Sequence, residues 1–306
     1  MTMNTTTRET VQPLLIDAAI YRRFIGRYYL SALKAVSPER DNEVFELTLS
    51  DSSGDLTVIA RHDQIADEVI LEHTMIHVEV AALPTRVGTV RVCKNLTCAA
   101  ASKRLGNSLS ALPISQCPRP AVFQAFLVLY ARIQSTLMRR FIDDVLLQPK
   151  IGISFLQCPA TIRSHHAYVG GLIEHAVEVA WNVSGVHALT DIERDVAVVA
   201  ALLHGVGKTR TLSAGATKTA LGTLVEPELL TLEVCADALH NLESHSPLLA
   251  NQLRYIWTSG IFREHTCGQN EALLYDVLAR SVKSSKVSQQ SMAFLAEAEI
   301  DTPAFV

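Results

Sequence analysis

One stretch of sequence decides the fold of the second half of this chain: Phe155-Leu-Gln-Cys-Pro-Ala-Thr-Ile-Arg-Ser-His-His-Ala-Tyr-Val-Gly-Gly-Leu-Ile-Glu-His175. A second stretch, Ala200-Ala-Leu-Leu-His-Gly-Val-Gly-Lys208, follows it by about one helix. Each stretch ends an apolar segment with a histidine, His175 in the first and His204 in the second. Imidazoles that converge from two buried helices are common metal ligands. The pattern predicts helices over 171–185 and 191–205, each carrying one of these histidines.

Together the two stretches resemble the signature segments of the HD superfamily of metal-dependent phosphohydrolases. In that family the second segment reads His-Asp, and the two side chains bind adjacent metal ions. The resemblance puts His175 at the first ligand histidine and His204 at the second. Gly205 stands where the bridging aspartate belongs, and glycine has no ligand atom in its side chain. The resemblance therefore implies the HD fold with a damaged metal site.

The family's remaining ligand positions are also altered. Members carry a Leu-Gly-His turn, then a Ser-His-His segment, then an aspartate in a late helix that begins Glu-Ala-Leu. The residues of this chain at those positions are Thr223, then Gly260 with Ile261, then Leu278 or Ala279, with Asp276 one turn earlier. About two imidazoles are too few to hold a phosphohydrolase metal pair. We therefore expect no cofactor, or a divalent metal if the protein is active.

Three further residues of the two motifs are interpreted as vestiges of the catalytic site: His165, His166 and Lys208. We expect the two histidines to shape the tight turn that leads into Gly170-Gly171. The lysine approaches substrate phosphate in an active family member, whereas in an inactive one it closes the end of a helix favourably. A relocated site for one metal ion, built from His175, His204 and another histidine of this half, is the alternative. The other histidines considered are His165, His166, His240, His245 and His265.

The N-terminal part of the chain has the pattern of a small β-barrel. An amphipathic stretch, Leu14 to Tyr29, is interpreted as a helix running into a strand. Alternating or clustered apolar residues then predict five short strands, with a helical interruption between Asp63 and Glu72. The strands are expected at 28–36, 43–49, 56–60, 75–80 and 89–93. Five strands with one interruption is the plan of an OB-type Greek-key barrel.

From Ala121 onward the apolar spacing is helical. The expected helices cover 122–147, 171–185, 191–205, 226–243, 247–258 and 270–283. The predicted fold class is therefore α+β, an OB-like barrel followed by an all-α HD-type domain. The predicted boundaries are a helical lead-in over 1–27, the barrel over 28–95, a linker over 96–120 and the helical domain over 121–306.

This order of barrel, linker and helical domain resembles the YhaM-type 3′–5′ exoribonucleases, which join an OB-fold to an HD domain. The His-His…Gly-Gly-Leu…His pattern also resembles the HD-like domain of TraI-type conjugative relaxases, which implies a plasmid or mobile-element context.

Composition narrows the class of protein. The chain has 306 residues, of which 48% are hydrophobic and 19% charged, so it can bury a substantial core. A formal charge of −4 argues against a generally basic nucleic-acid binder. The sequence has no apolar run of the roughly 20 residues that a membrane-spanning helix needs, and no secretion signal at its start. Six scattered cysteines suit reduced thiols. We therefore expect a cytoplasmic protein that does not bind membranes.

A local nucleic-acid site on the barrel is the remaining positive expectation. Single-strand binding on an OB-fold needs aromatic platforms beside a positive groove. The candidate residues are Tyr28, Tyr29, Lys34, Arg61, Arg86 and Arg91. Phe45, His62 and Lys94 lie near them in the sequence.

Three functions follow from these observations. The leading hypothesis is a catalytically inactive HD relative that binds single-stranded nucleic acid or a protein partner. The second is an active metal-dependent 3′–5′ exonuclease or phosphohydrolase. The third is a structural assembly subunit that uses neither metal nor nucleic acid.

Overall fold

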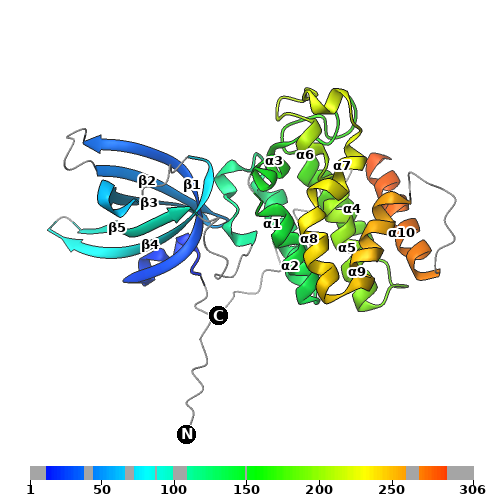
Figure 1. Ribbon diagram of the computed structural model, residues 1–306, viewed down its shortest axis with the longest axis horizontal. Helices are drawn as coiled ribbons and strands as arrows, with labels where there is room; N and C mark the ends of the chain where they lie inside the picture. Colours follow the sequence, from blue (N-terminus) through cyan, green and yellow to red (C-terminus); the bar gives the residue numbers. More distant parts are fainter. Residues whose placement is uncertain are drawn as a thin grey trace, which may run out of the picture. The chain divides into compact units, whose positions relative to one another are not determined.

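The computed structural model describes residues 12–37, 44–65, 72–86, 88–98, 109–148, 150–259 and 269–287. The chain divides into two compact units, Met1–Ser115 and Gln116–Val306. The first is a β-barrel and the second is helical, so the fold is α+β, as predicted (Figure 1). No helix within the described ranges combines the length and the apolar character needed to cross a membrane.

The first unit is a closed barrel with the strand order β1-β2-β3-β5-β4. Its strands are β1 (Arg23–Ser37), β2 (Val44–Asp51), β3 (Gly54–Arg61), β4 (Thr74–Thr85) and β5 (Gly88–Cys98). Neighbouring strands are antiparallel except β3 and β5, which close the barrel through a parallel pairing. This topology is compatible with an OB-like fold. The expected strands are confirmed, although each extends further along the chain than the sequence predicted.

The long strand β1 closes the barrel by pairing with two neighbours. Its first half pairs with β4 and its second half with β2. Register shifts after Leu30 and after Ala35 bend the strand between these two pairings. A 3₁₀ helix, η1 (Leu15–Ile20), precedes β1 in place of the expected longer helix, and a second, η2 (His62–Gln64), follows β3. Residues 66–71 of the expected helical interruption lie outside the described residues.

The turn between β2 and β3 ties η1 to the barrel. The buried Asp51 carboxylate accepts hydrogen bonds from the backbone N–H groups of Leu15, Ser53 and Gly54. Gly54 has a φ of +148°, which is why glycine suits the end of this turn. The turn predicted from Asp51-Ser-Ser-Gly-Asp55 is therefore confirmed.

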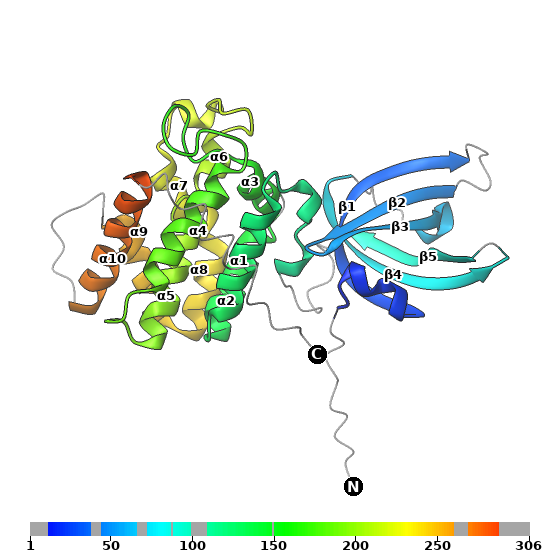
Figure 2. The ribbon, with the colours of Figure 1, turned by 180° about the vertical axis from the view of Figure 1, so that it is seen from behind.

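The second unit places its two most buried helices, α4 (Gly171–Ser184) and α5 (Asp191–Leu203), side by side at its centre (Figures 1 and 2). The other helices surround them. They are α1 (Pro120–Arg132), α2 (Thr136–Leu146), α3 (Ile151–Gln157), α6 (Lys208–Thr211), α7 (Pro227–Val234), α8 (Ala236–His245), α9 (Pro247–Thr258) and α10 (Gln269–Val287). The short 3₁₀ helix η6 (Leu221–Thr223) belongs to this unit, whereas η4 (Leu109–Ala111) ends the first unit and η5 (Ile114–Gln116) lies at the boundary between the two.

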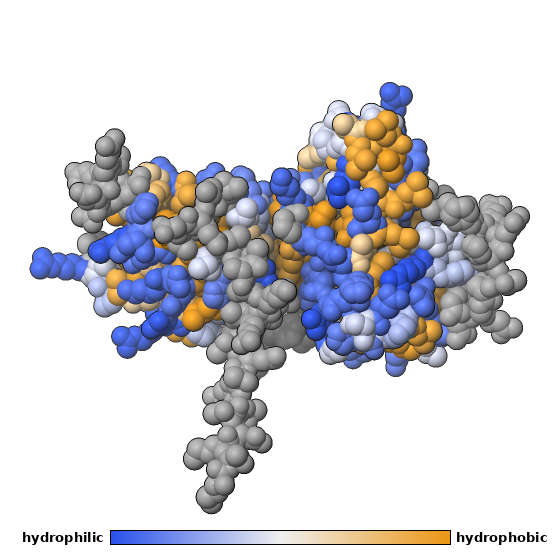
Figure 3. Space-filling model, in the orientation of Figure 1, coloured by the Kyte–Doolittle hydropathy of each residue, from blue (hydrophilic) through white to orange (hydrophobic). Residues whose placement is uncertain are grey.

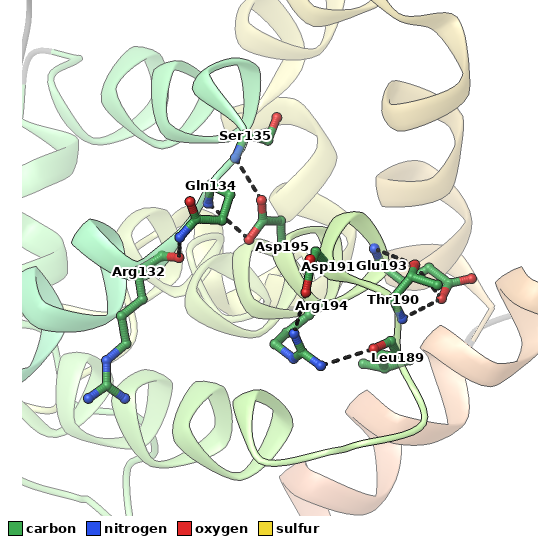
Figure 4. Close-up of polar contacts among 9 residues, drawn as sticks. All are labelled: Arg132, Gln134, Ser135, Leu189, Thr190, Asp191, Glu193, Arg194 and Asp195. Carbon is green, nitrogen blue, oxygen red and sulfur yellow. Dashed lines mark hydrogen bonds and ion pairs between the residues drawn. The ribbon is translucent and has the colours of Figure 1, made fainter.

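Two predicted helices are each broken into two. The segment 122–147 forms α1 and α2, because the backbone between them is held by a side chain of α5 (Figure 4). The buried Asp195 carboxylate accepts the backbone N–H groups of Gln134 and Ser135, and the Ser135 hydroxyl caps α2. The segment 226–243 likewise forms α7 and α8, which meet at Cys235. Helical periodicity continues through both breaks, so spacing alone does not reveal them.

Candidate functional site

The turn between α3 and α4 holds His166 beside the start of α4. Ala160 donates its backbone N–H to the His166 carbonyl, and His166 itself has a left-handed φ of 55°. A Cβ atom on Gly171 would lie 2.1 Å from the His166 carbonyl oxygen, so only glycine allows this approach. The expectation that His166 shapes the turn into Gly170-Gly171 is confirmed. His165 contributes through its carbonyl, which accepts the Thr161 hydroxyl, and its side chain is exposed.

His175 and His204 meet at the centre of the unit, one on α4 and the other just after α5. Their Nε2 atoms are 3.2 Å apart, and His175 is buried. His204 Nδ1 lies 2.6 Å from the carbonyl oxygen of Ala201. Because a carbonyl only accepts, His204 carries its proton on Nδ1, and its Nε2 presents a lone pair to His175. The two motifs quoted above are thus brought into direct contact.

A second polar chain runs from His166 to Arg119. Tyr168 donates its hydroxyl to the Glu174 carboxylate at 2.6 Å, and Arg119 Nε forms an ion pair with the same oxygen at 3.0 Å. The tyrosine has one proton, so its oxygen must accept from His166 Nδ1, 2.8 Å away. Burial, and then the hydrogen bond to Glu174, raise the pKa of Tyr168 and keep it a proton donor.

The other ring nitrogen of His166 faces a carboxylate of α4. His166 Nε2 lies 3.1 Å from Glu178 Oε2. One ring nitrogen of His166, one of His175 and a carboxylate oxygen of Glu178 all lie within 4.8 Å of one another. We call His166, His175, Glu178 and His204 the histidine cluster. Its donor set of imidazole and carboxylate suits a transition metal such as Zn²⁺.

Gly205, where the resemblance implies an aspartate, lies close to Leu172. A Cβ atom added to Gly205 would lie 2.9 Å from Leu172 Cδ1 and 3.9 Å from Lys208 Nζ. Leu172 is fully buried on α4, so it has little room to move. A side chain at position 205 would therefore require Leu172 to shift.

Lys208 does not end a helix as expected. It is the first residue of the short helix α6, and its backbone N–H donates to the Gly205 carbonyl. The chain forms a tight turn after α5, and this turn displaces the lysine from the helix C-terminus. Its ammonium group instead lies beside the space that the aspartate occupies in the family.

The later family positions do not supply metal ligands in the described residues. The Thr223 hydroxyl donates to the Ala220 carbonyl, and Asp276 is exposed on α10. Leu278 is buried, and His240 and His245 are exposed. Gly260, Ile261 and His265 lie outside the described residues.

The two tyrosines expected to stack on nucleic acid belong to the barrel core, and this expectation is wrong. Tyr28 is fully buried, and its hydroxyl donates to the Pro13 carbonyl. Tyr29 is 3% exposed, and burial raises its pKa to about 12. Phe45 also packs against the core. Because inward-facing residues alternate along a strand, aromatic residues in a small barrel fill its interior.

The four expected basic residues do not form one charged surface on a single strand pair. Lys34 lies on β1, but its register partner on β2 is Glu46. Arg61 ends β3, and Arg86 follows β4; both are exposed. Arg91 on β5 donates to the Tyr21 carbonyl. These residues therefore stay individual candidates for phosphate contacts.

Four polar residues around the cluster were not selected from the sequence: Arg119, Tyr168, Glu174 and Glu178. Glu178 could have been found from the spacing His175-x-x-Glu178, because residues three apart lie on one face of a helix. Nothing local marks Arg119, because it comes from the start of α1, more than 50 residues earlier.

Compared with known proteins, the chain matches no protein-family model and no curated protein.

Proposed function

We propose that this chain is a catalytically inactive relative of the HD phosphohydrolases that works by binding a protein partner. The observation that carries the proposal is the packing at Gly205. The family's site needs a carboxylate there to join two metal ions, and the Cβ atom of such a residue would lie 2.9 Å from Leu172 Cδ1. A chance loss of the aspartate would leave a gap, whereas a filled space indicates that the helices repacked around the loss.

The HD and OB identities are part of this proposal. Support for the HD identity comes from the contact between His175 and His204, the two residues that the resemblance assigns to neighbouring ligand positions. Support for the OB identity comes from the strand order β1-β2-β3-β5-β4. Neither the His175–His204 contact nor the strand order establishes an activity by itself, since one fold supports many functions.

A protein partner is favoured over nucleic acid by the distribution of apolar side chains. Large apolar residues are exposed in the α3–α4 turn and in the segment from η6 to α7, at one end of the helical unit (Figure 3). They are Ile162, Tyr168, Val169, Leu224 and Leu229. Leu224 is 84% exposed. Exposed apolar groups of this kind mark protein-binding surfaces, whereas the aromatic rings that single-strand binding needs are buried in the barrel core.

A hydrolysis assay tests the inactive state. Purified protein is incubated with single-stranded RNA, single-stranded DNA and bis(p-nitrophenyl) phosphate in the presence of Mn²⁺, Mg²⁺ or Zn²⁺. We expect no metal-dependent hydrolysis by the wild type or by Gly205→Asp, because the added carboxylate meets Leu172. Turnover by the wild type that is lost in His175→Gln would refute the proposal and establish the active alternative.

Affinity capture from the host tests the partner. The wild type is compared with Leu224→Ser/Leu229→Ser, and with Leu248→Ser as a control of similar exposure on α9. We expect one protein to be captured by the wild type and the control and lost in the double variant. Tight binding of single-stranded oligonucleotides at physiological salt, measured by fluorescence anisotropy, would instead favour the nucleic-acid alternative.

A further inference from the structure

We propose that the histidine cluster binds a single divalent ion of the zinc class, with His166, His175 and Glu178 as ligands and His204 as the fourth. This site differs from the one that the resemblance implies. It uses His166 and Glu178, which are absent from the family's ligand pattern, and it needs nothing at position 205. It is also independent of the proposed function, because a single buried ion can hold a fold together without catalysis.

Two adjoining segments, the turn before α4 and α4 itself, and a third segment after α5 supply the ligands. His166 comes from the turn before α4, His175 and Glu178 from one face of α4, and His204 from the end of α5. Two neighbouring pairs of atoms are already 3.1 and 3.2 Å apart, His166 Nε2 with Glu178 Oε2 and His175 Nε2 with His204 Nε2. Ligand atoms on one tetrahedral zinc ion are separated by roughly 3.0–3.5 Å, given zinc–ligand distances near 2.1 Å. These two pairs therefore already have the spacing of ligands on one zinc ion, and binding requires the ligand atoms of His166, His175 and Glu178, now within 4.8 Å of one another, and that of His204 to draw closer together.

The hydrogen-bond network calls for positive charge between His166 and Glu178. Because His166 Nδ1 donates to Tyr168, the Nε2 atom of a neutral His166 is an acceptor. A lone pair on Nε2 and a carboxylate oxygen 3.1 Å away repel each other unless a proton or a cation lies between them. A divalent ion satisfies both groups at once.

The outer hydrogen bonds distinguish a metal ligand from an ordinary buried histidine. Metal-binding histidines donate their second ring N–H to a carbonyl or to a chain that ends on a carboxylate. His204 donates Nδ1–H to the Ala201 carbonyl, and His166 donates Nδ1–H through Tyr168 to Glu174. Both rings are thereby fixed with Nε2 directed into the cluster. Two histidines oriented in the same way from different segments argue for a common ligand.

Burial makes the site selective and gives it a structural role. The side chains of His166 and Glu178 are 10% and 13% exposed, and His175 is 5% exposed. An ion there ties the α3–α4 turn to α4 and α5, and that turn carries Ile162, Tyr168 and Val169 of the apolar end. Metal binding should therefore raise the melting temperature.

The test uses the full chain with zinc alone. The protein is stripped with chelator and dialysed, then titrated with Zn²⁺ by calorimetry and by thermal unfolding. We expect one ion per chain and a rise in Tm. His166→Gln and Glu178→Gln should each weaken Zn²⁺ binding by at least ~100-fold, because loss of a direct ligand exceeds the 10–100-fold effect of outer partners. His165→Gln is the matched control, since it changes the exposed neighbour and should bind like the wild type.

Cobalt substitution and circular dichroism complete the test. Co²⁺ bound to nitrogen and oxygen gives weak visible bands without the thiolate charge-transfer absorption that cysteine ligands produce, so the cysteines are excluded directly. Circular dichroism checks that each variant is folded, and Glu178→Gln keeps the shape of the side chain if His166→Gln unfolds. The proposal is overturned if the wild type binds no Zn²⁺ at micromolar concentration. It is equally overturned if folded Glu178→Gln binds Zn²⁺ as tightly as the wild type. Hydrolysis by the zinc-loaded protein would refute the proposed function and leave this site standing.

Discussion

Asp195 offers a direct test of how the helical unit is held together. Its carboxylate is buried on α5 and accepts the backbone N–H of Ser135 at 2.7 Å and that of Gln134 at 3.2 Å, at the break between α1 and α2 (Figure 4). In Asp195→Ala, both N–H groups lose their acceptor away from water. Each such bond to a charged group contributes about 1.5–3 kcal/mol. Because the second bond is long, we expect the free energy of unfolding to fall by about 3–4 kcal/mol in total.

The isosteric variant separates hydrogen bonding from volume. Asp195→Asn keeps one carbonyl acceptor but turns an NH₂ group toward the second N–H donor, so we expect a loss of about 2 kcal/mol. Asp191→Ala is the matched control on the first turn of the same helix. The Asp191 side chain is 88% exposed, and its ion pair with Arg194 should contribute less than about 0.5 kcal/mol.

Urea unfolding followed by tryptophan fluorescence measures the free energy of unfolding of the helical unit in the wild type and in each variant. Both tryptophans of the chain, Trp181 on α4 and Trp257 on α9, belong to the helical unit. An Asp195→Ala variant that unfolds within about 1 kcal/mol of the wild type, with an unchanged denaturant slope, would contradict the assignment of this carboxylate as the support for the break.

Three further predictions follow from the packing and protonation described above. Gly171→Ala places a Cβ atom 2.1 Å from the His166 carbonyl oxygen, so we expect the free energy of unfolding in urea to fall by about 1–3 kcal/mol or more. Gly185→Ala is the control and should be nearly neutral, because the nearest contact of its Cβ atom is 3.7 Å. Burial raises the pKa of Cys158 and of Cys235 to about 12, so both thiols should be unreactive toward Ellman's reagent at pH 8. Peptide mapping should find both cysteines unmodified in the native protein and modified in urea. Rapid labelling of the native protein would contradict their burial. Since the pKa of a thiol is about 9 when unfolded, the stability that these two protonated thiols provide should be complete below pH 9 and lost as the pH rises toward 12. Hydrogen bonds from Thr190 lower the pKa of Glu193 in the capping box of α5. Glu193→Gln should therefore destabilise the unit at pH 7, and the difference from the wild type should vanish as the pH falls through the lowered pKa of Glu193; equal stability of the two proteins at pH 7 would argue against the cap.

Local spacing predicts most of the elements, and tertiary contacts decide where it fails. Apolar periodicity places α4, α5 and α9 to within one or two residues, because each buries a continuous stripe against the others. The break between α1 and α2 is invisible in that pattern, since its cause is Asp195, 60 residues later. Such a break depends on a buried carboxylate that looks, from the sequence, like any helix-surface aspartate.

The barrel shows the same limit for functional residues. Tyr28 and Tyr29 carry the chemistry of a stacking surface, but they are adjacent on β1 and both are buried. A one-residue alternation predicts that one of two neighbours faces outward. The Tyr28 hydroxyl donates to the Pro13 carbonyl, and the Tyr29 ring packs beside His73 with ring centroids 6.2 Å apart. The sequence therefore identifies aromatic residues that could stack on nucleic-acid bases, but it does not reveal which of them are exposed to solvent.

Gly205 directly follows His204 of the histidine cluster and has no side chain that could be a partner for its rings. Gly205 brings no negative charge to the buried place that holds His175 and His204. Buried polar groups need partners, and one that loses its partner destabilises the fold by about 1–3 kcal/mol. The contact between His175 and His204, and the approach of His204 Nδ1 to the Ala201 carbonyl, give these rings partners without a carboxylate from position 205.

Gly205→Asp should therefore be destabilising, because its Cβ atom would lie 2.9 Å from Leu172 Cδ1 and the histidines are already engaged. Thermal unfolding with and without Mn²⁺ measures the effect. A gain of stability and of metal binding in Gly205→Asp would show that the family's centre is still intact beneath the substitution.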